Sequence, residues 1–158
     1  MSDVAWSAYQ LPCPVVFVST AYGEKQDIMT ATAFVVSEKE PLLAVSLAKG
    51  HLTSQLIEKS RSFTLILASE SHKELALKLG TMSGEEKVKQ ISLDTVSGES
   101  GKRLIPAGSS AWFECRMISR YDVSDYHLFI GQVISQKDLK NSPLLWYRER
   151  GFFTVKPL

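Results

Sequence analysis

The sequence predicts a mainly β fold, a closed antiparallel barrel of about six or seven strands with two or three short helices. Short apolar segments rich in β-branched residues are separated by turn-forming residues, as in a series of strands. Strands do not alternate with long helices, so a parallel α/β sheet is not indicated. One late segment, Tyr126 to Ile134, is apolar on both faces, as expected of a barrel strand covered from two sides. The length of 158 residues suits a single domain spanning 1–158.

Four strands are expected in the first half of the chain, separated by loops of polar residues, glycine or proline. These segments are Val15 to Thr20, Ile28 to Val36, Leu42 to Leu47 and Phe63 to Leu67. A glycine-containing loop joins the first two segments, and a loop ending in Pro41 joins the second and third. Sequential antiparallel pairing is therefore the simplest topology.

Two short amphipathic helices are expected between and after these strands. From Thr53 to Ser60 the apolar side chains fall on one side, and Thr53 is the expected N-cap. A Ser-x-x-Glu capping box at Ser71 predicts the start of a second helix, which Gly80 ends. The same pattern recurs more weakly at Ser83 and predicts one further turn.

The second half begins with a segment rich in serine, glycine and charge, Ser92 to Gly108, which predicts an extended surface connection. Two long strands follow, Ala111 to Tyr121 and Tyr126 to Gln136, around the turn at 122–125. Four aromatic residues then bracket the turn at 148–151 of a C-terminal hairpin. Core or interface packing is favoured over flavin cover as the role of Trp146, Tyr147, Phe152 and Phe153.

Composition excludes several classes of protein and site. Lys and Arg total 18 against 17 acidic residues without a long run of one sign, which argues against nucleic-acid binding. The apolar runs are too short to cross a bilayer and the N-terminus lacks a secretory pattern, so a cytoplasmic protein is expected. Cys13 and Cys115 predict isolated thiols, and His51, His72 and His127 are too dispersed to predict a metal site. The common nucleotide, hydrolase and zinc-protease motifs are missing.

Two blocks of sequence carry a family resemblance. Asp27 to Phe34 contains Met29-Thr30-Ala31-Thr32, and Ser46 and Thr53 flank a polar loop that opens a helix. This arrangement resembles the flavin reductase-like and flavoredoxin family, in which a strand N-x-M-T-A-[ST] precedes a proline-containing turn and a strand ending in Ser or Val. The likeness covers most of the chain, with further matches at Pro12–Ser19, Gly80–Gly84 and Asp125–Val133.

The resemblance implies an FMN-binding split β-barrel that forms a homodimer, with the flavin where two subunits meet. It implies an NAD(P)H-dependent oxidoreductase in which hydride passes to flavin N5 and electrons pass to free flavin, an oxygenase or a redox protein. Small side chains such as Ala31 let the backbone approach the flat ring, and Lys49 lies beside a helix N-terminus suited to the phosphate. No catalytic side chain is expected. The expected cofactor-binding residues are Met29, Thr30, Ala31, Thr32, Ser46, Leu47, Ala48, Lys49, His51 and Thr53.

One departure from the family pattern keeps two readings of activity open. The family's Gly-Asp-His segment is replaced by Asp125-Tyr126-His127, and the resemblance implies that His127 contacts the nicotinamide or the substrate edge of the flavin. The alternative to a reductase is an FMN-binding electron carrier that exchanges electrons with a partner protein and does not oxidise NAD(P)H itself. A third reading is a barrel that serves assembly without a cofactor.

Overall fold

A computed structural model describes residues 11–82, 93–98, 101–147 and 151–158 of the chain. The described helical elements are α2 (Leu52–Ser60), the single 3-10 turn η2 (Glu70–His72) and α3 (Lys73–Thr81). The strands are β1 (Cys13–Tyr22), β2 (Lys25–Ser37), β3 (Leu42–Ala48), β4 (Ser62–Leu67), β5 (Asp94–Gly98), β6 (Gly101–Ile105), β7 (Ala111–Val123), β8 (Tyr126–Asp138), β9 (Leu144–Tyr147) and β10 (Gly151–Thr154).

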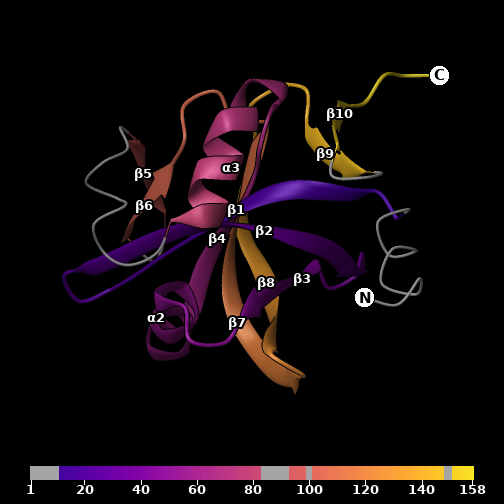
Figure 1. Ribbon diagram of the computed structural model, residues 1–158. Coiled ribbons are helices and arrows are strands. Elements are labelled where there is room, and N and C mark those ends of the chain that lie inside the picture. The colour runs from indigo at the N-terminus through magenta and orange to yellow at the C-terminus, as the bar shows by residue number, and fades with distance from the viewer. Residues whose placement is uncertain (1–10, 83–92, 99–100, 148–150) are drawn as a thin grey trace.

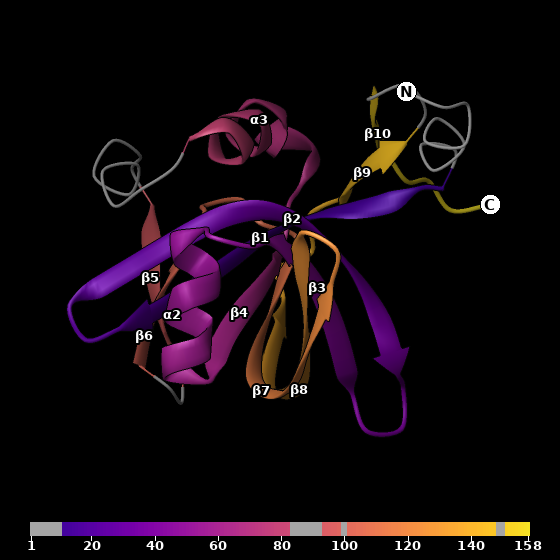
Figure 2. The ribbon, with the colours of Figure 1, turned by 60° about the horizontal axis from the view of Figure 1, so that its bottom comes forward.

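Six antiparallel strands close into a barrel in the order β1-β2-β3-β8-β7-β4, and β4 pairs back with β1. The β9–β10 hairpin continues the sheet from the N-terminal end of β1, and β5–β6 forms a separate two-stranded sheet. Figures 1 and 2 show these two hairpins on opposite sides of the barrel. The predicted mainly β, antiparallel split barrel is confirmed, including the strand hairpin around residues 122–125.

Strand β1 shows how the sequence fills two layers. Val16 and Val18 point into the barrel, where they join an interior cluster with Phe63 and Phe129. Phe17 points outward and packs in a second cluster beneath α3 and β6. Because successive strand residues face opposite sides, a strand segment buried on both faces is apolar throughout, as β1 is from Val15 to Val18. Helix α2 packs against β1 and β2 beside the barrel.

The expectation of an extended surface connection from Ser92 to Gly108 is wrong, because β5 and β6 form a hairpin there. Leu104 and Ile105 of β6 are buried in the outer cluster, and the Leu104 N–H donates to Ser19 Oγ at 3.2 Å. The apolar residues of this segment are too sparse in sequence to produce a strand pattern, so the hairpin depends on packing against the barrel. Within the described ranges, no helix is long and apolar enough to span a membrane.

Both helices are confirmed, although their predicted starts were wrong. The N-cap of α2 is His51, and Thr53 lies within the first turn. The capping box belongs to Ser69 and His72, because Ser69 N–H donates to His72 Nδ1 at 3.1 Å, and it opens η2 just before α3. A histidine ring nitrogen thus takes the acceptor role usually filled by Glu or Gln. The turn predicted at Ser83 lies outside the described residues.

Candidate functional site

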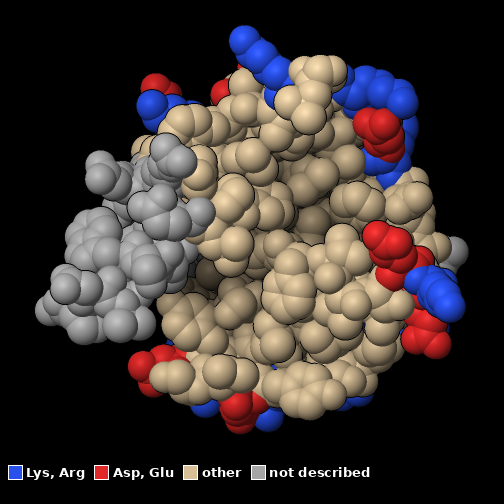
Figure 3. Space-filling view, turned by 90° about the vertical axis from the view of Figure 1, so that its right-hand side faces the viewer, with Lys and Arg blue, Asp and Glu red and all other residues tan. Residues whose placement is uncertain are grey.

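A groove of about 460 Å³ lies on the outer wall of the barrel. Strands β2 and β3 form one wall, α3 borders it, and the β9–β10 hairpin stands opposite. Figure 3 shows that the face of the molecule beside β9 and β10 carries few charged side chains near its centre and is hollowed there. Such a concave, mostly uncharged surface with a few polar groups suits an organic ligand.

The β2–β3 wall is built from small and hydroxyl-bearing side chains. Thr32 of β2 pairs with Ser46 of β3 in the sheet, and both line the groove together with Ala31 and Ala48. Thr30 Oγ1 donates to the Ala76 carbonyl at 2.7 Å, which ties β2 to α3 at the edge of the groove. Short side chains along this wall leave the backbone accessible to a flat molecule.

The opposite wall is aromatic. Trp146 of β9 and Phe152 of β10 are cross-strand partners whose rings meet edge to face with centroids 5.0 Å apart. Both line the groove, as does Tyr126 of β8. The core or interface packing predicted for these two hairpin residues is confirmed, because both pack against the outer core cluster while they also line the groove. The alternation of strand residues could have separated them from their neighbours in sequence. Tyr147 and Phe153 make their own edge-to-face contact in the same hairpin.

The structure gathers seven of the ten expected cofactor-binding residues around this groove, and three lie elsewhere. Leu47 is fully buried in the barrel interior, and Lys49 is exposed in the loop before α2, where its N–H donates to the Asp125 carbonyl at 2.9 Å. Thr53 is also fully buried, and its hydroxyl donates to Asp27 Oδ2 at 2.5 Å. Cofactor binding by the whole set stays a prediction. The seven lining residues are Met29, Thr30, Ala31, Thr32, Ser46, Ala48 and His51.

The N-terminus of α2 lies next to the groove and has the properties of an anion site. His51 makes no side-chain capping hydrogen bond, and the first turn carries no acidic residue. The backbone N–H groups in the first turn of any helix have no intrahelical acceptor, and here no side-chain cap replaces one. They also lie at the positive end of the helix dipole. His51 lines the groove and Lys49 stands two residues earlier. These donors fit a phosphate group, whereas the Thr53 hydroxyl is already bonded to Asp27.

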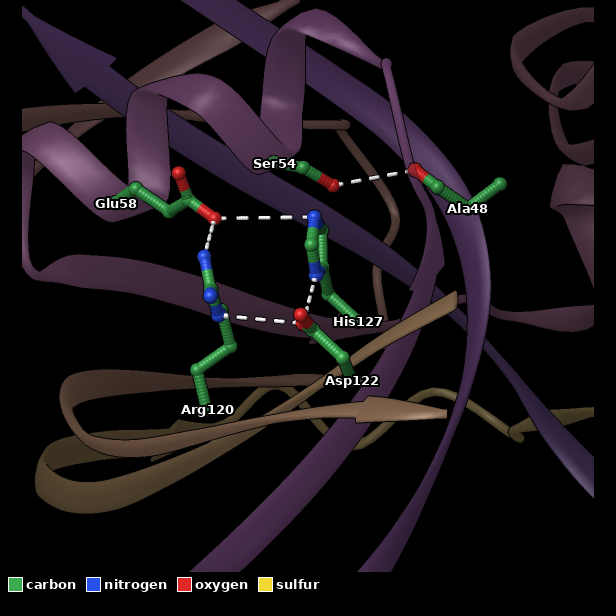
Figure 4. A network of polar contacts seen from close by, with 6 residues as sticks. All are labelled: Ala48, Ser54, Glu58, Arg120, Asp122 and His127. Carbon is green, nitrogen blue, oxygen red and sulfur yellow. Dashed lines mark hydrogen bonds and ion pairs between the residues drawn. The ribbon is translucent and has the colours of Figure 1, made fainter. Parts of the chain in front are cut away.

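His127 belongs to a separate polar network, shown in Figure 4. Its Nδ1 lies 2.7 Å from Asp122 Oδ1, and its Nε2 lies 3.8 Å from Glu58 Oε1. Arg120 contacts the same two carboxylates, which closes a ring of four charged or titratable side chains. The hydrogen bond from His127 is the main cause that holds the pKa of Asp122 below its usual value. Tyr126 lines the groove and its neighbour His127 does not, so the predicted nicotinamide contact is untested.

Metal chemistry has no counterpart in the part of the chain that the structure describes. No three His, Cys, Asp or Glu side chains in these ranges are grouped so as to hold a metal ion. The two cysteines are free thiols, Cys13 half-buried and Cys115 buried. The groove is lined by residues for which the family resemblance implies cofactor binding, and it is the candidate site for organic chemistry.

Comparison with known proteins agrees with this geometry. The family model described as "Flavin reductase like domain" matches residues 8–156. A "Probable flavin reductase" of Rhizobium meliloti is 30% identical over 155 residues, which is 96% of this chain and 47% of that protein. The chain thus spans about half the length of this relative.

Two solved structures have the same fold. BorF, the flavin reductase component of a bacterial two-component tryptophan halogenase, superposes with a TM-score of 0.85 at 19% identity and covers 98% of both chains. An FMN-binding protein from Thermus thermophilus gives a TM-score of 0.81 at 23% identity, over 91% of this chain and 86% of that one. Since the family model spans nearly the whole sequence, this chain belongs to the flavin reductase-like family.

Proposed function

We propose that this protein binds FMN in the groove and, as a homodimer, transfers hydride from NADH or NADPH to the flavin. One observation carries the proposal. The groove unites β2 residues Met29 to Thr32 with Ser46 and Ala48 of β3 and with His51 before α2. These segments are separate in sequence, and each is a segment for which the family resemblance implies flavin binding.

The shapes and donors of the groove support a flavin. The backbone at Ala31, whose methyl group packs against the barrel interior, and the short side chain of Ala48 give a flat wall on which an isoalloxazine ring can lie, with main-chain groups available to its polar edge. Trp146 provides an aromatic surface on the opposite side. The α2 N-terminus, with Lys49 and His51, suits the single phosphate of FMN. FMN binding by the structurally similar Thermus thermophilus protein also favours FMN.

The cofactor would supply the hydride-accepting centre and the onward electron transfer to free flavin, an oxygenase or a redox protein. The residues of this chain would hold the ring, place the phosphate and shield the ring from water. Trp146 and Phe152, which line the groove, would cover part of the ring. A hydride transfer of this kind requires placement and no general acid or base, so no side chain is assigned a catalytic role.

Dimerisation is part of the proposal, because the groove is open and lies near an exposed apolar stretch. Phe34, Val35 and Val36 at the end of β2 are 56%, 61% and 45% exposed. Consecutive exposed apolar residues on a strand are unusual for a surface that faces only water. Light scattering after size exclusion should give twice the chain mass, and Val35→Lys should yield monomers that bind FMN more weakly. A monomeric wild type with full FMN affinity would remove the dimer from the proposal.

A second candidate is an FMN electron carrier that does not oxidise NAD(P)H. The observation that favours it is His127, whose imidazole is bonded to Asp122 and does not line the groove. The family resemblance implies that this histidine contacts the nicotinamide. Without that contact, NADH or NADPH would reduce the bound flavin slowly. The two candidates share the flavin site and differ only in the electron donor.

The first test is the absorbance spectrum of the freshly purified protein, with the released cofactor identified by chromatography. FMN bands and FMN on the column support the proposed site, and a colourless protein that does not quench added FMN contradicts it. Anaerobic stopped-flow mixing with NADH and NADPH then separates the two candidates. Rapid bleaching of the bound flavin supports the reductase, whereas bleaching only by dithionite or a reduced partner protein supports the carrier.

A further inference from the structure

A second hollow, of about 520 Å³, lies at the other end of strand β1. The C-terminal end of α2, the β1–β2 turn, β6 and β7 border it. Val15 of β1 lines the flavin groove and Ala21 lines this hollow. Six residues of strand separate them by about 20 Å. The two sites are therefore distinct on one chain.

Four cations from separate places in the sequence line the hollow, and none of its lining residues is acidic. Lys59 and Arg61 lie at the end of α2, Arg103 is on β6 and Arg116 is on β7. We define these four side chains as the basic pocket. Cations brought together in a concave site repel one another, so their convergence favours a negatively charged ligand.

Arg103 forms the buried floor of the basic pocket. It is 5% exposed, and its Nη2 donates to Ser62 Oγ at 2.9 Å. Burial lowers the pKa of this guanidinium, and the nearby buried Glu114 acts in the opposite direction. Glu114 therefore offsets part of the positive charge of Arg103 from within the protein.

The other three cations have no such compensation. Among the described residues, Lys59, Arg61 and Arg116 take part in no ion pair. Lys59 is in the last turn of α2, where its interaction with the helix dipole is enough to explain a cation. Arg61, which directly follows α2, also lies at the negative end of this dipole, whereas Arg116 on β7 is not explained in this way. The basic pocket thus holds an excess of about three positive charges, which matches a polyvalent anion better than a carboxylate.

The backbone of Arg61 gives an independent indication. It is the C-cap of α2, with φ of 62° and ψ of 25°, and its N–H donates to the Ile57 carbonyl at 2.7 Å. This left-handed position ordinarily favours glycine, because a side chain there is strained. An arginine in this left-handed position at the rim of a pocket indicates a function for its side chain.

We propose that the basic pocket binds a small molecule bearing a polyvalent phosphate group, separately from the flavin. Guanidinium groups bond phosphate oxygens in pairs, and Arg61 and Arg116 offer two of them beside the buried Arg103. Tyr22 and Ile134 add uncharged surface beside the cations, where an organic portion of the ligand can lie. The ligand class is therefore a phosphate ester or diphosphate of the size of a nucleotide.

The test uses inorganic pyrophosphate and ADP as probes, titrated by calorimetry into protein freed of unbound flavin. Saturable binding of one probe per chain is expected at low ionic strength. Arg61→Gly combined with Arg116→Gln should weaken it by about tenfold or more, because two charge-assisted contacts are lost. A charge-matched control, Lys39→Gln with Lys156→Gln, removes two exposed cations outside the pocket and should leave binding unchanged.

Arg61→Gly alone separates a binding defect from a folding defect. Glycine relieves the left-handed strain, so this variant should melt at a higher temperature than the wild type while it binds pyrophosphate more weakly. Three results would overturn the proposal: no saturable binding, equal loss in the control variant, or release of bound flavin by pyrophosphate. The last result would place the anion at the α2 N-terminus. If the protein carries no flavin, the same titration on the apoprotein still decides the question.

Discussion

The interior of the barrel and the groove on its outer wall are made from the same strands, but interior side chains pack together and groove side chains are open to a ligand. In β3, Val45 and Leu47 are fully buried in the interior cluster, whereas Ser46 and Ala48 are partly exposed along the groove. Strand alternation thus assigns one face to packing and the next to a ligand. Changes in the interior should therefore affect stability alone, and changes in the groove should affect flavin affinity.

The strongest test of this division compares one substitution at two glycines. In the interior, a Cβ at Gly131 would lie 2.6 Å from Phe63 Cζ and 2.8 Å from Cys115 Cβ. We expect Gly131→Ala to lower the free energy of unfolding by about 1–3 kcal/mol, because the packed core cannot accept another methyl group. Denaturant unfolding measures this loss, and the protein that remains folded should bind FMN normally.

At the edge of the groove, Gly80 is the matched control. A Cβ there would meet only Thr30 Cβ, at an ordinary 3.8 Å, and Gly80 lies within α3. Gly80→Ala should raise the free energy of unfolding by up to about 1 kcal/mol, since alanine favours helix. Adding Phe63→Leu to Gly131→Ala should recover part of the lost stability. Equal destabilisation at both glycines would contradict the proposed contrast.

The next effect concerns the aromatic wall. Trp146→Ala should raise the dissociation constant for FMN about tenfold, because the ring loses an apolar surface. The half-buried Trp146 contributes less to the core than interior residues do, so the melting temperature should fall only modestly. Fluorescence titration of FMN measures the affinity.

Phe153→Ala is the control within the same hairpin, because Phe153 stacks on Tyr147 and does not line the groove. It should leave FMN affinity unchanged. A loss of affinity equal to that of Trp146→Ala would mean that the hairpin as a whole, and no particular side chain, supports the site.

The barrel was predictable from sequence because its strands carry a strong local signal. β-Branched runs such as Val15 to Thr20 identified strands whose pairing the structure confirms. The β5–β6 hairpin was not predictable, because its apolar residues are sparse in sequence, and Leu104 and Ile105 are buried by packing against the barrel. Local propensity fails where tertiary packing decides.

The candidate site was predictable to a similar degree. The order of the motifs in the sequence predicted a shared site for Thr30, Ser46 and His51, and in the structure these three residues line one groove. The aromatic wall required the strand register, and the basic pocket required β6, which sequence reasoning had treated as a connection. Thr53 illustrates the remaining difficulty, because only the fold reveals that its hydroxyl is bonded to a buried carboxylate.

A smaller effect distinguishes Lys49 from Thr53 at the α2 N-terminus. Lys49→Ala should weaken FMN binding about fivefold at low salt and leave riboflavin binding unchanged, because only FMN carries the phosphate. Thr53→Val should lower the free energy of unfolding by about 1 kcal/mol, since Asp27 loses a hydrogen-bond donor. It should not change the ratio of FMN to riboflavin affinity. If Lys49→Ala weakened the binding of FMN and riboflavin equally, Lys49 would not contact the phosphate.

The smallest effect returns to the interior, at Cys115. Burial raises the pKa of this thiol to about 12, and the Glu114 carboxylate adds to the rise. The unfolded thiol ionises near pH 8.5, so the protonated form is favoured by folding. This contribution is complete below about pH 8.5 and is lost as the pH rises from there towards 12. At pH 8.5 the loss is about 0.4 kcal/mol.

Cys115→Ala should therefore remove part of the fall in unfolding free energy between pH 7 and pH 9, whatever its effect at neutral pH. The half-buried Cys13 gives the contrast, because a thiol reagent at pH 8 should modify it rapidly in the native protein. Cys115 should react only at the rate of unfolding. Rapid modification of two thiols in the folded protein would show that the interior is open to solvent, and the distinction between a rigid interior and an accessible groove would no longer hold.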